Sequence, residues 1–216
     1  MDRCLILDCD GVLVDSEVVA NRVAARCFTE AGAPIGEEEM IRRFAGMKAT
    51  KVTEMVFAEH GLEAPPDATE LRRQAIMAAF ETELTPMPGI AEALDAIPAP
   101  KCVASSSHPE RIALSLRITG LAGYFGDKVF SSFMVERGKP APDLFLLAAE
   151  RMGAVPADCI VVEDSVAGVE AGRAAGMRVI GFIGGSHCRE GHADKLSASG
   201  AERVIGHMRD LPAAVG

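Results

Sequence analysis

The sequence predicts an α/β protein with a Rossmann-like core, a parallel sheet flanked by helices, and an all-helical insert after the first strand. Short apolar runs rich in Val and Ile recur without strict alternation, as in strands that are buried on both faces. From residue 98 onward these runs alternate with helical segments, which is typical of right-handed strand–helix–strand crossovers. Between residues 16 and 86 no strand-like run occurs, so this stretch predicts the insert.

Each expected strand is short and ends in Asp, Ser or Gly. The strands span Cys4–Leu7, Lys101–Ala104, Lys128–Phe130, Cys159–Val162, Arg178–Ile183 and Arg203–Ile205. The segment PDLFLLAAERMG predicts a helix, because Pro142 and Asp143 open it and Gly153 closes it. A second helix is expected in DSVAGVEAGRAAG, where glycines at every fourth position form one ridge that packs closely on the sheet. These glycines are Gly168, Gly172 and Gly176.

The insert is expected to contain helix after helix. The predicted helices are Val18–Ala31, Glu37–Phe44, Thr50–His60 and Asp67–Glu83. Asp67 and Glu70 have the spacing of a capping box at the start of the last one. The predicted domains are therefore a core of residues 1–15 and 88–216 and a helical domain of residues 16–87.

The composition excludes several classes of partner. A net charge of −9 over 216 residues argues against a nucleic-acid partner, since a duplex backbone repels an acidic surface. No apolar window approaches the roughly 18 residues of a membrane span, and the first apolar run is too short for a signal peptide. The six cysteines are scattered without a CxxC pair, which favours a reducing, cytoplasmic compartment. No obligate protein partner is evident.

The stretch LILDCDGVLVDSE places two acids directly after the first expected strand. Asp8 and Asp10 would lie on one face of an extended chain, where like charges repel. Such a pair is tolerable mainly if a cation lies between the two carboxylates. The opening of the chain therefore predicts a cation site.

Other strands also end in polar residues. Ser105 follows the second strand, Glu163 and Asp164 follow the fourth, and Lys139 lies in RGKPAPD before a helix. The carboxyl ends of parallel strands meet at one edge of the sheet, where ligands bind. Each residue has a simpler interpretation: Asp164 as a helix N-cap, Ser105 as a turn residue, and Lys139 as a solvated surface lysine. Their coincidence at one edge favours a site.

Phosphoryl transfer is the chemistry that this set predicts. Mg²⁺ prefers oxygen ligands, which Asp8 and Asp164 supply as carboxylates and Asp10 as a backbone carbonyl. Glu163 would help directly or through water. Ser105, Lys139 and backbone N–H groups near Ser106 would hold the remaining faces of the phosphoryl group.

The two neighbouring aspartates can then divide the work. The carboxylate of Asp8 can attack the phosphoryl group and form an aspartyl-phosphate. Asp10 can protonate the leaving oxygen and later deprotonate the water that releases phosphate.

These motifs resemble those of the haloacid-dehalogenase-like phosphohydrolases. The matching stretches, in order, are DCDGVLVDSE, the Ser105 tip, GKPAPDLF and VVEDSVAGVEAG. The resemblance implies Asp8 as nucleophile, Asp10 as acid/base, Ser105 and Lys139 as phosphate binders, and Glu163 and Asp164 as metal-side acids. Family members that dehalogenate lack the second aspartate, so Asp10 argues against dehalogenation. The helical insert resembles the small cap of the family.

Within the family, RRFAGMKATKV resembles the cap segment of 6-phosphogluconate phosphatase and related sugar-phosphate phosphatases. Gly46, Met47 and Lys48 lie at a helix-to-helix turn that could select the substrate, although Lys48 could also be a solvated residue. β-Phosphoglucomutase is another near relative, but it carries an arginine where this chain has Ala49. The mutase interpretation is weaker for that reason, because a mutase must hold a second phosphate.

Several other polar residues have an open interpretation. Arg72 and Arg73 are expected on a solvated helix face, although they or Lys48 could still hold a second phosphate. His108 could contact the substrate or only begin a helix. The cluster His187, Cys188 and His192 resembles a metal site, but its loop setting and the lack of a matching second pair predict chance proximity.

Three functions compete. The first is a Mg²⁺-dependent phosphatase of a small phosphorylated metabolite, such as a sugar or sugar-acid phosphate. The second is a hexose-phosphate mutase. The third is a non-catalytic binding module, against which the intact set of Asp8, Asp10, Lys139 and Asp164 argues. A nucleotide-binding protein is disfavoured, since no GxGxxG follows the first strand.

Overall fold

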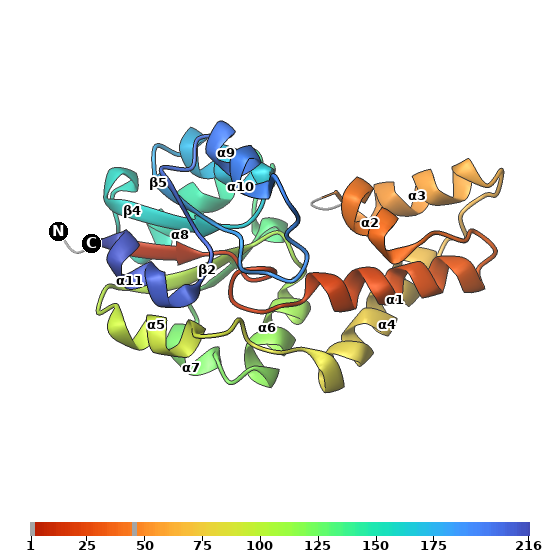
Figure 1. Cartoon of the computed structure of the whole chain (residues 1–216), viewed down its shortest axis with the longest axis horizontal. Coiled ribbons are helices and arrows are strands. Elements are labelled where there is room, and N and C mark those ends of the chain that lie inside the picture. Colours follow the sequence, from red (N-terminus) through yellow and green to blue (C-terminus); the bar gives the residue numbers. More distant parts are fainter. Residues whose placement is uncertain (1–2, 45–46) are drawn as a thin grey trace. The chain divides into compact units, whose positions relative to one another are not determined.

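The computed structural model, described here for residues 3–44 and 47–216, contains a six-stranded sheet in the order β3-β2-β1-β4-β5-β6 (Figure 1). All five strand pairs are parallel, as expected from the apolar runs. The strands are β1 (Cys4–Leu7), β2 (Lys101–Ser105), β3 (Val129–Ser131), β4 (Cys159–Glu163), β5 (Arg178–Phe182) and β6 (Arg203–Ile205). The α/β fold class predicted from the sequence is confirmed.

Helices cover the sheet because its strands are apolar on both faces. On one face, residues of α8 (Asp143–Met152), α9 (Val166–Ala174) and α10 (His192–Ala198) share a core cluster with alternate strand residues such as Ile6 and Val161. The other helices of this unit are α5 (Ile90–Ala96), α6 (Pro109–Ile118), α7 (Ala122–Phe125) and α11 (Leu211–Val215). Helices α5, α6 and α7 lie on the opposite side of the sheet (Figure 1).

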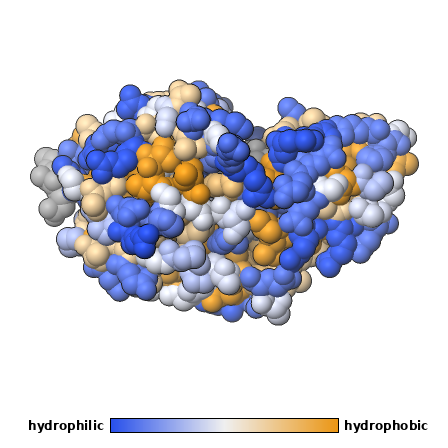
Figure 2. Space-filling view, in the orientation of Figure 1, coloured by the Kyte–Doolittle hydropathy of each residue, from blue (hydrophilic) through white to orange (hydrophobic). Residues whose placement is uncertain are grey.

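The chain divides into two compact units, Met1–Asp15 with Thr85–Gly216, and Ser16–Leu84. The second unit holds α1 (Glu17–Glu30), α2 (Glu37–Phe44), α3 (Ala49–Glu59) and α4 (Ala68–Glu83). Its core cluster includes Phe28, Phe44 and Phe57. Hydrophilic side chains predominate on its visible face (Figure 2).

Two expectations for the helical unit are wrong. Arg72 is buried: its guanidinium donates to Thr53 Oγ1 at 2.9 Å and to the Ala49 carbonyl at 2.8 Å, and it lies 4.7 Å from the centroid of the Phe28 ring. It therefore joins α3 to α4 from inside. The capping box is also absent among the described residues: Asp67 precedes α4 in an αR conformation, without a side-chain cap bond.

The glycine ridge of α9 packs on the sheet at two of its three positions. A Cβ on Gly172 would lie 2.7 Å from Val179 Cγ2, and one on Gly168 would lie 1.9 Å from Glu163 Cδ. The expectation is wrong for Gly176, which follows the helix in a left-handed conformation with nothing within 4 Å of an added Cβ. In the described part of the chain, no helix is long and apolar enough to cross a membrane.

Phe145 of α8 links the core to Lys139, whose Nζ lies 5.0 Å from the centroid of the phenyl ring. This ring is fully buried, whereas the neighbouring Leu146 is 40% exposed. Replacing Phe145 by Ala should lower the free energy of unfolding by about 3–5 kcal/mol, because a large cavity remains. The matched control Leu146→Ala should change it by about 0.5 kcal/mol or less in the same urea titration. Equal effects of both variants would contradict the packing described.

Candidate active site

The register of three strands places the central residues of the site at one level. Leu7 pairs with Val103 of β2 and with Val162 of β4. The residues one position further along these three segments are Asp8, Ala104 and Glu163, and they therefore lie side by side at the carboxyl edge of the sheet. In the order β3-β2-β1-β4-β5-β6 the sequence of strands reverses between β1 and β4, where ligands bind in open parallel sheets.

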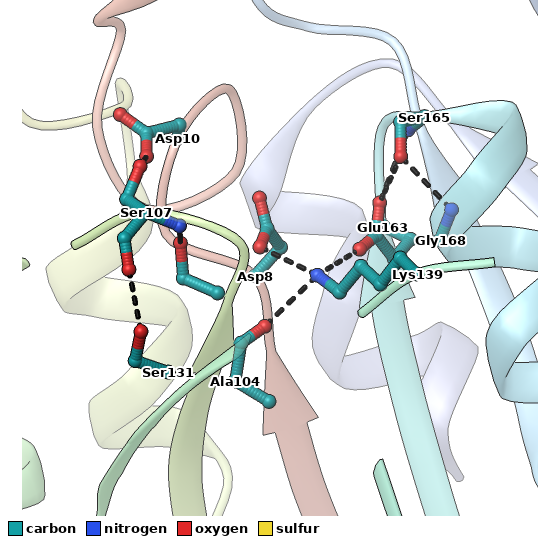
Figure 3. Close-up of polar contacts among 10 residues, drawn as sticks. Asp8, Asp10, Ala104, Ser107, Ser131, Lys139, Glu163, Ser165 and Gly168 are labelled. Atoms are coloured by element: carbon teal, nitrogen blue, oxygen red, sulfur yellow. Dashed lines mark hydrogen bonds and ion pairs between the residues drawn. The ribbon is translucent and has the colours of Figure 1, made fainter. Parts of the chain in front are cut away.

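Lys139 joins these three strand ends. Its ammonium group donates to Asp8 Oδ1 at 2.7 Å, to the Ala104 carbonyl at 2.9 Å and to Glu163 Oε1 at 2.5 Å (Figure 3). The side chain is only 5% exposed, so the alternative of a solvated surface lysine is wrong. Burial lowers the pKa of Lys139, but the two carboxylates outweigh it and raise the pKa above its usual value.

Glu163 is held by the protein on both carboxylate oxygens. While Oε1 accepts from Lys139, Oε2 accepts from the backbone N–H of Ser165 at 3.1 Å and from its hydroxyl at 2.9 Å. Ser165 also caps α9, because its Oγ accepts from Gly168 N at 3.0 Å. The N-cap is thus Ser165, and the alternative that Asp164 serves as the cap is wrong.

Asp8 lies among like charges. Burial raises the pKa of its carboxyl well above the usual range, Lys139 opposes this, and Glu163, Asp164 and Asp10 raise the pKa further. Oxygen atoms of Asp8, Glu163 and Asp164 lie within 4.8 Å of one another. Lys139 pairs with Asp8 and Glu163 only, and the three carboxylates together offer the oxygen ligands that a hard cation takes.

Asp10 belongs to a separate network. Its carboxylate accepts from Ser107 Oγ at 2.6 Å, and Ser131 Oγ donates to the Ser107 carbonyl (Figure 3). Arg111 Nη2 also donates to the Asp10 carboxylate at 2.6 Å. The premise that Asp8 and Asp10 share one face of an extended strand is wrong, since β1 ends at Leu7. The two carboxylates instead have different partners.

The phosphate-binding residues expected from the sequence lie at the end of β2. Ser105 is the buried last residue of β2, and its Oγ accepts from the Ser107 N–H at 3.1 Å, which leaves its hydroxyl hydrogen for another acceptor. Ser106 follows and is exposed. His108 is the N-cap of α6, since its Nδ1 accepts from Glu110 N at 3.4 Å.

The cap residues expected to select the substrate belong to the helical unit. Gly46 lies outside the described residues. Lys48 is exposed and immediately precedes α3, and Met47 packs against the core of that unit.

Asp164 has a partner that the sequence did not indicate. Its Oδ2 lies 2.9 Å from His187 Nε2, and its backbone carbonyl lies 2.6 Å from His192 Nε2. Burial lowers the pKa of His187, but Asp164 and Cys188 raise it to about 11. The contacts of Ser107 and Arg111 with Asp10 and of His187 with Asp164 were not predicted, because nothing in the local spacing of these residues indicates which distant carboxylate they contact.

This fold and site define an α/β enzyme with an acidic, lysine-anchored edge. More particularly, the chain belongs to the haloacid dehalogenase-like hydrolase family, whose model matches residues 3–176. The chain is 38% identical over 186 residues to 6-phosphogluconate phosphatase of Escherichia coli K12, a match that covers 86% of this chain and 84% of that protein.

Solved structures agree with the family. A haloacid dehalogenase-like protein of unknown function from Agrobacterium tumefaciens is 41% identical with a TM-score of 0.89, over 100% of this chain and 98% of that one. A hydrolase of the family from Deinococcus radiodurans, solved with bound phosphate and sodium, is 34% identical with a TM-score of 0.82, over 99% of this chain and 95% of that one.

The cluster around Lys139 should stabilise the folded state. Lys139→Met would leave Asp8 and Glu163 buried without their cation and should lower the free energy of unfolding by about 3–5 kcal/mol. Adding Glu163→Gln should restore at least about 1 kcal/mol, because one unpaired charge is removed. Urea titrations in a chelator test this, with the exposed Lys195→Met as control. If Lys139→Met were as stable as wild type, the stabilising role of Lys139 would be refuted.

The ion pair of His187 should make stability depend on pH. Its folded pKa, about 11, lies above the unfolded value of 6.5, so the stabilisation is complete below about pH 6.5 and is lost as pH rises toward 11. Relative to His187→Gln, wild-type unfolding free energy should fall by at most about 1.4 kcal/mol per pH unit. Urea titrations in a chelator between about pH 6.5 and 9.5 measure this. The exposed His207→Gln should follow wild type, and parallel curves for all three proteins would contradict the ion pair.

Proposed function

We propose that the chain is a Mg²⁺-dependent phosphatase that hydrolyses a small phosphorylated metabolite, a sugar or sugar-acid phosphate such as 6-phosphogluconate. One observation carries the proposal: the buried carboxylate of Asp8 is held by Lys139 beside the acids Glu163 and Asp164, while Asp10 is held independently. The similarity to 6-phosphogluconate phosphatase supports the substrate class. The relative that was solved with phosphate and sodium supports a site for an anion and a cation.

The donor set fits Mg²⁺, because the atoms offered are carboxylate oxygens. Asp8 and Asp164 would hold the ion together with the backbone carbonyl of Asp10. Glu163 would act through a bound water, since both of its oxygens already accept hydrogen bonds. When bound, the ion would neutralise charge on the phosphoryl oxygens.

In the first step, a carboxylate oxygen of Asp8 attacks phosphorus and the bond from phosphorus to the leaving oxygen breaks. Asp10 gives its proton to that oxygen, and an aspartyl-phosphate remains on Asp8. Lys139 and the hydroxyl of Ser105 hold the transferred group, assisted by backbone N–H groups near Ser106. In the second step, Asp10 takes a proton from water, the water oxygen bonds to phosphorus, and the bond to Asp8 breaks.

The contacts of Asp10 suit the second step directly. Both of its carboxylate oxygens accept hydrogen bonds, from Ser107 and Arg111, so in this arrangement Asp10 is a proton acceptor. Donation in the first step requires at least one of these bonds to open. Arg111 and Ser107 therefore position the acid/base and restrain its rotation.

We assign substrate selection to the helical unit, with Gly46 and Lys48 as binding residues. A mutase must hold a second phosphate outside the core. Arg72 is unsuited to that role, because its guanidinium is engaged with Thr53 and Ala49. Arg73 is paired with Glu70, and Ala49 stands where the mutase carries an arginine, so the phosphatase is favoured over the mutase.

The two aspartates should fail differently when changed to asparagine. Asp8→Asn should lower turnover by at least about 10⁴-fold, because the nucleophile is lost. Asp10→Asn should lower it by about 10²–10⁴-fold, the usual contribution of a general acid/base. Phosphate release from 6-phosphogluconate measures both, with the exposed Asp127→Asn as control. Substantial release by Asp8→Asn that is free of wild-type enzyme would reject Asp8 as the nucleophile.

Phosphorus NMR with Mg²⁺ distinguishes the functions. We expect free phosphate to grow from 6-phosphogluconate or another sugar phosphate, and to stop when a chelator removes the ion. Transfer of phosphate between carbons of glucose 1-phosphate, primed by a trace of the bisphosphate, would establish a mutase. Binding without turnover across the panel would favour a non-catalytic module, and full activity in chelator would reject the metal assignment.

A further inference from the structure

Three metal-binding side chains meet beside the acidic edge, although chance proximity was expected from the sequence. His187 and Cys188 lie in the loop after β5, and His192 begins α10. One donor atom from each residue lies within 4.8 Å of the others. The loop and the helix thus bring together two imidazoles and a thiol, a set that suits a transition metal and not Mg²⁺.

His187 and Cys188 are already separated as two ligands of one ion would be. His187 Nε2 lies 3.6 Å from Cys188 Sγ. Zinc binds nitrogen at about 2.0–2.1 Å and sulfur at about 2.3 Å, so tetrahedral geometry places the two donors roughly 3.6 Å apart. Little rearrangement of this pair is needed to receive an ion.

His192 has the outer contact that metal-binding histidines usually have. Its Nε2 lies 2.6 Å from the Asp164 backbone carbonyl, which can only accept, so Nε2 carries the hydrogen. That bond orients the ring and leaves Nδ1 as the nitrogen with a lone pair.

Asp164 contacts the set through one of its members. Its Oδ2 is 2.9 Å from His187 Nε2, so this carboxylate is the further donor that we assign to the site. Two glycines make room for this arrangement: a Cβ on Gly11 would lie 1.9 Å from Asp164 Oδ2, and one on Gly185 would lie 2.8 Å from His187 Nδ1. The backbone around the cluster is therefore shaped to these side chains.

An ion pair between His187 and Asp164 alone does not account for the cluster. It leaves the convergence of Cys188 and His192 unexplained.

We propose that His187, Cys188, His192 and Asp164 form a binding site for a divalent transition metal such as Zn²⁺. Asp164 is shared with the Mg²⁺ site of the proposed function. The two ions therefore compete, and each lowers the affinity of the protein for the other by the same factor. The transition-metal site itself does not depend on the phosphatase assignment.

Cobalt(II) is the probe, because its bond to a thiolate gives a charge-transfer absorption that oxygen and nitrogen ligands do not give. Titrating the metal-free wild-type protein with Co²⁺ should produce this band, and Zn²⁺ should remove it by displacement. Cys188→Ser should abolish the band and weaken Zn²⁺ binding, measured by competition with a chromophoric chelator. Loss of a hydrogen-bond partner of a metal ligand typically lowers metal affinity roughly 10–100-fold. Loss of the ligand Cys188 itself should lower the affinity for Zn²⁺ by at least this factor.

The control is Cys27→Ser, because Cys27 and Cys188 are the two cysteines that are partly exposed. This variant should keep the full cobalt band, and His192→Gln should bind Zn²⁺ more weakly than wild type. Absence of the band in wild type, or its persistence in Cys188→Ser, would overturn the site. Excess Mg²⁺ should raise the dissociation constant for Co²⁺ in wild type, and an unchanged constant would overturn the sharing of Asp164. All these readouts are independent of turnover.

Discussion

The structure of the acidic edge of the sheet depends on one buried ammonium group. Lys139 contacts the ends of β1, β2 and β4 together, through Asp8, the Ala104 carbonyl and Glu163. Without it, two carboxylates would remain in a site with little water, where unpaired charges cost several kcal/mol. Ser165, which caps α9, donates to the Glu163 carboxylate, and Gly168 of α9 lies close to it. The start of α9 is therefore connected to Lys139 through Glu163.

Asp8 and Asp10 are only two positions apart in the chain, but they have different hydrogen-bond partners. Asp8 belongs to the lysine cluster at the centre of the sheet, whereas Asp10 belongs to Ser107 and Arg111 near the end of β2. In the function that we propose, the nucleophile Asp8 needs a fixed position, and the acid/base Asp10 must exchange protons and move slightly. Because their hydrogen-bond partners differ, Asp10 can move without breaking the hydrogen bonds of Asp8.

The sequence predicted the main elements and the residues at the carboxyl edge of the sheet, because the carboxyl ends of parallel strands always lie at the same edge. Asp8, Ser105 and Glu163 follow apolar runs, so their common location required only the sheet. Partner choice is different, because the contact of Arg111 with Asp10 depends on a helix direction and a side-chain rotamer. The burial of Arg72 was missed for a similar reason: adjacent arginines on a helix do not reveal which one faces the neighbouring helix.

Asp164 lies where two kinds of cation chemistry meet. On one side are the carboxylates Asp8 and Glu163, which offer only oxygen, and on the other are His187 and Cys188, which offer nitrogen and sulfur. A hard ion is drawn to the first set and a softer ion to the second, so donor chemistry separates the ions without any difference in cavity size. Because the same carboxylate belongs to both sets, filling either one changes the charge that the other experiences.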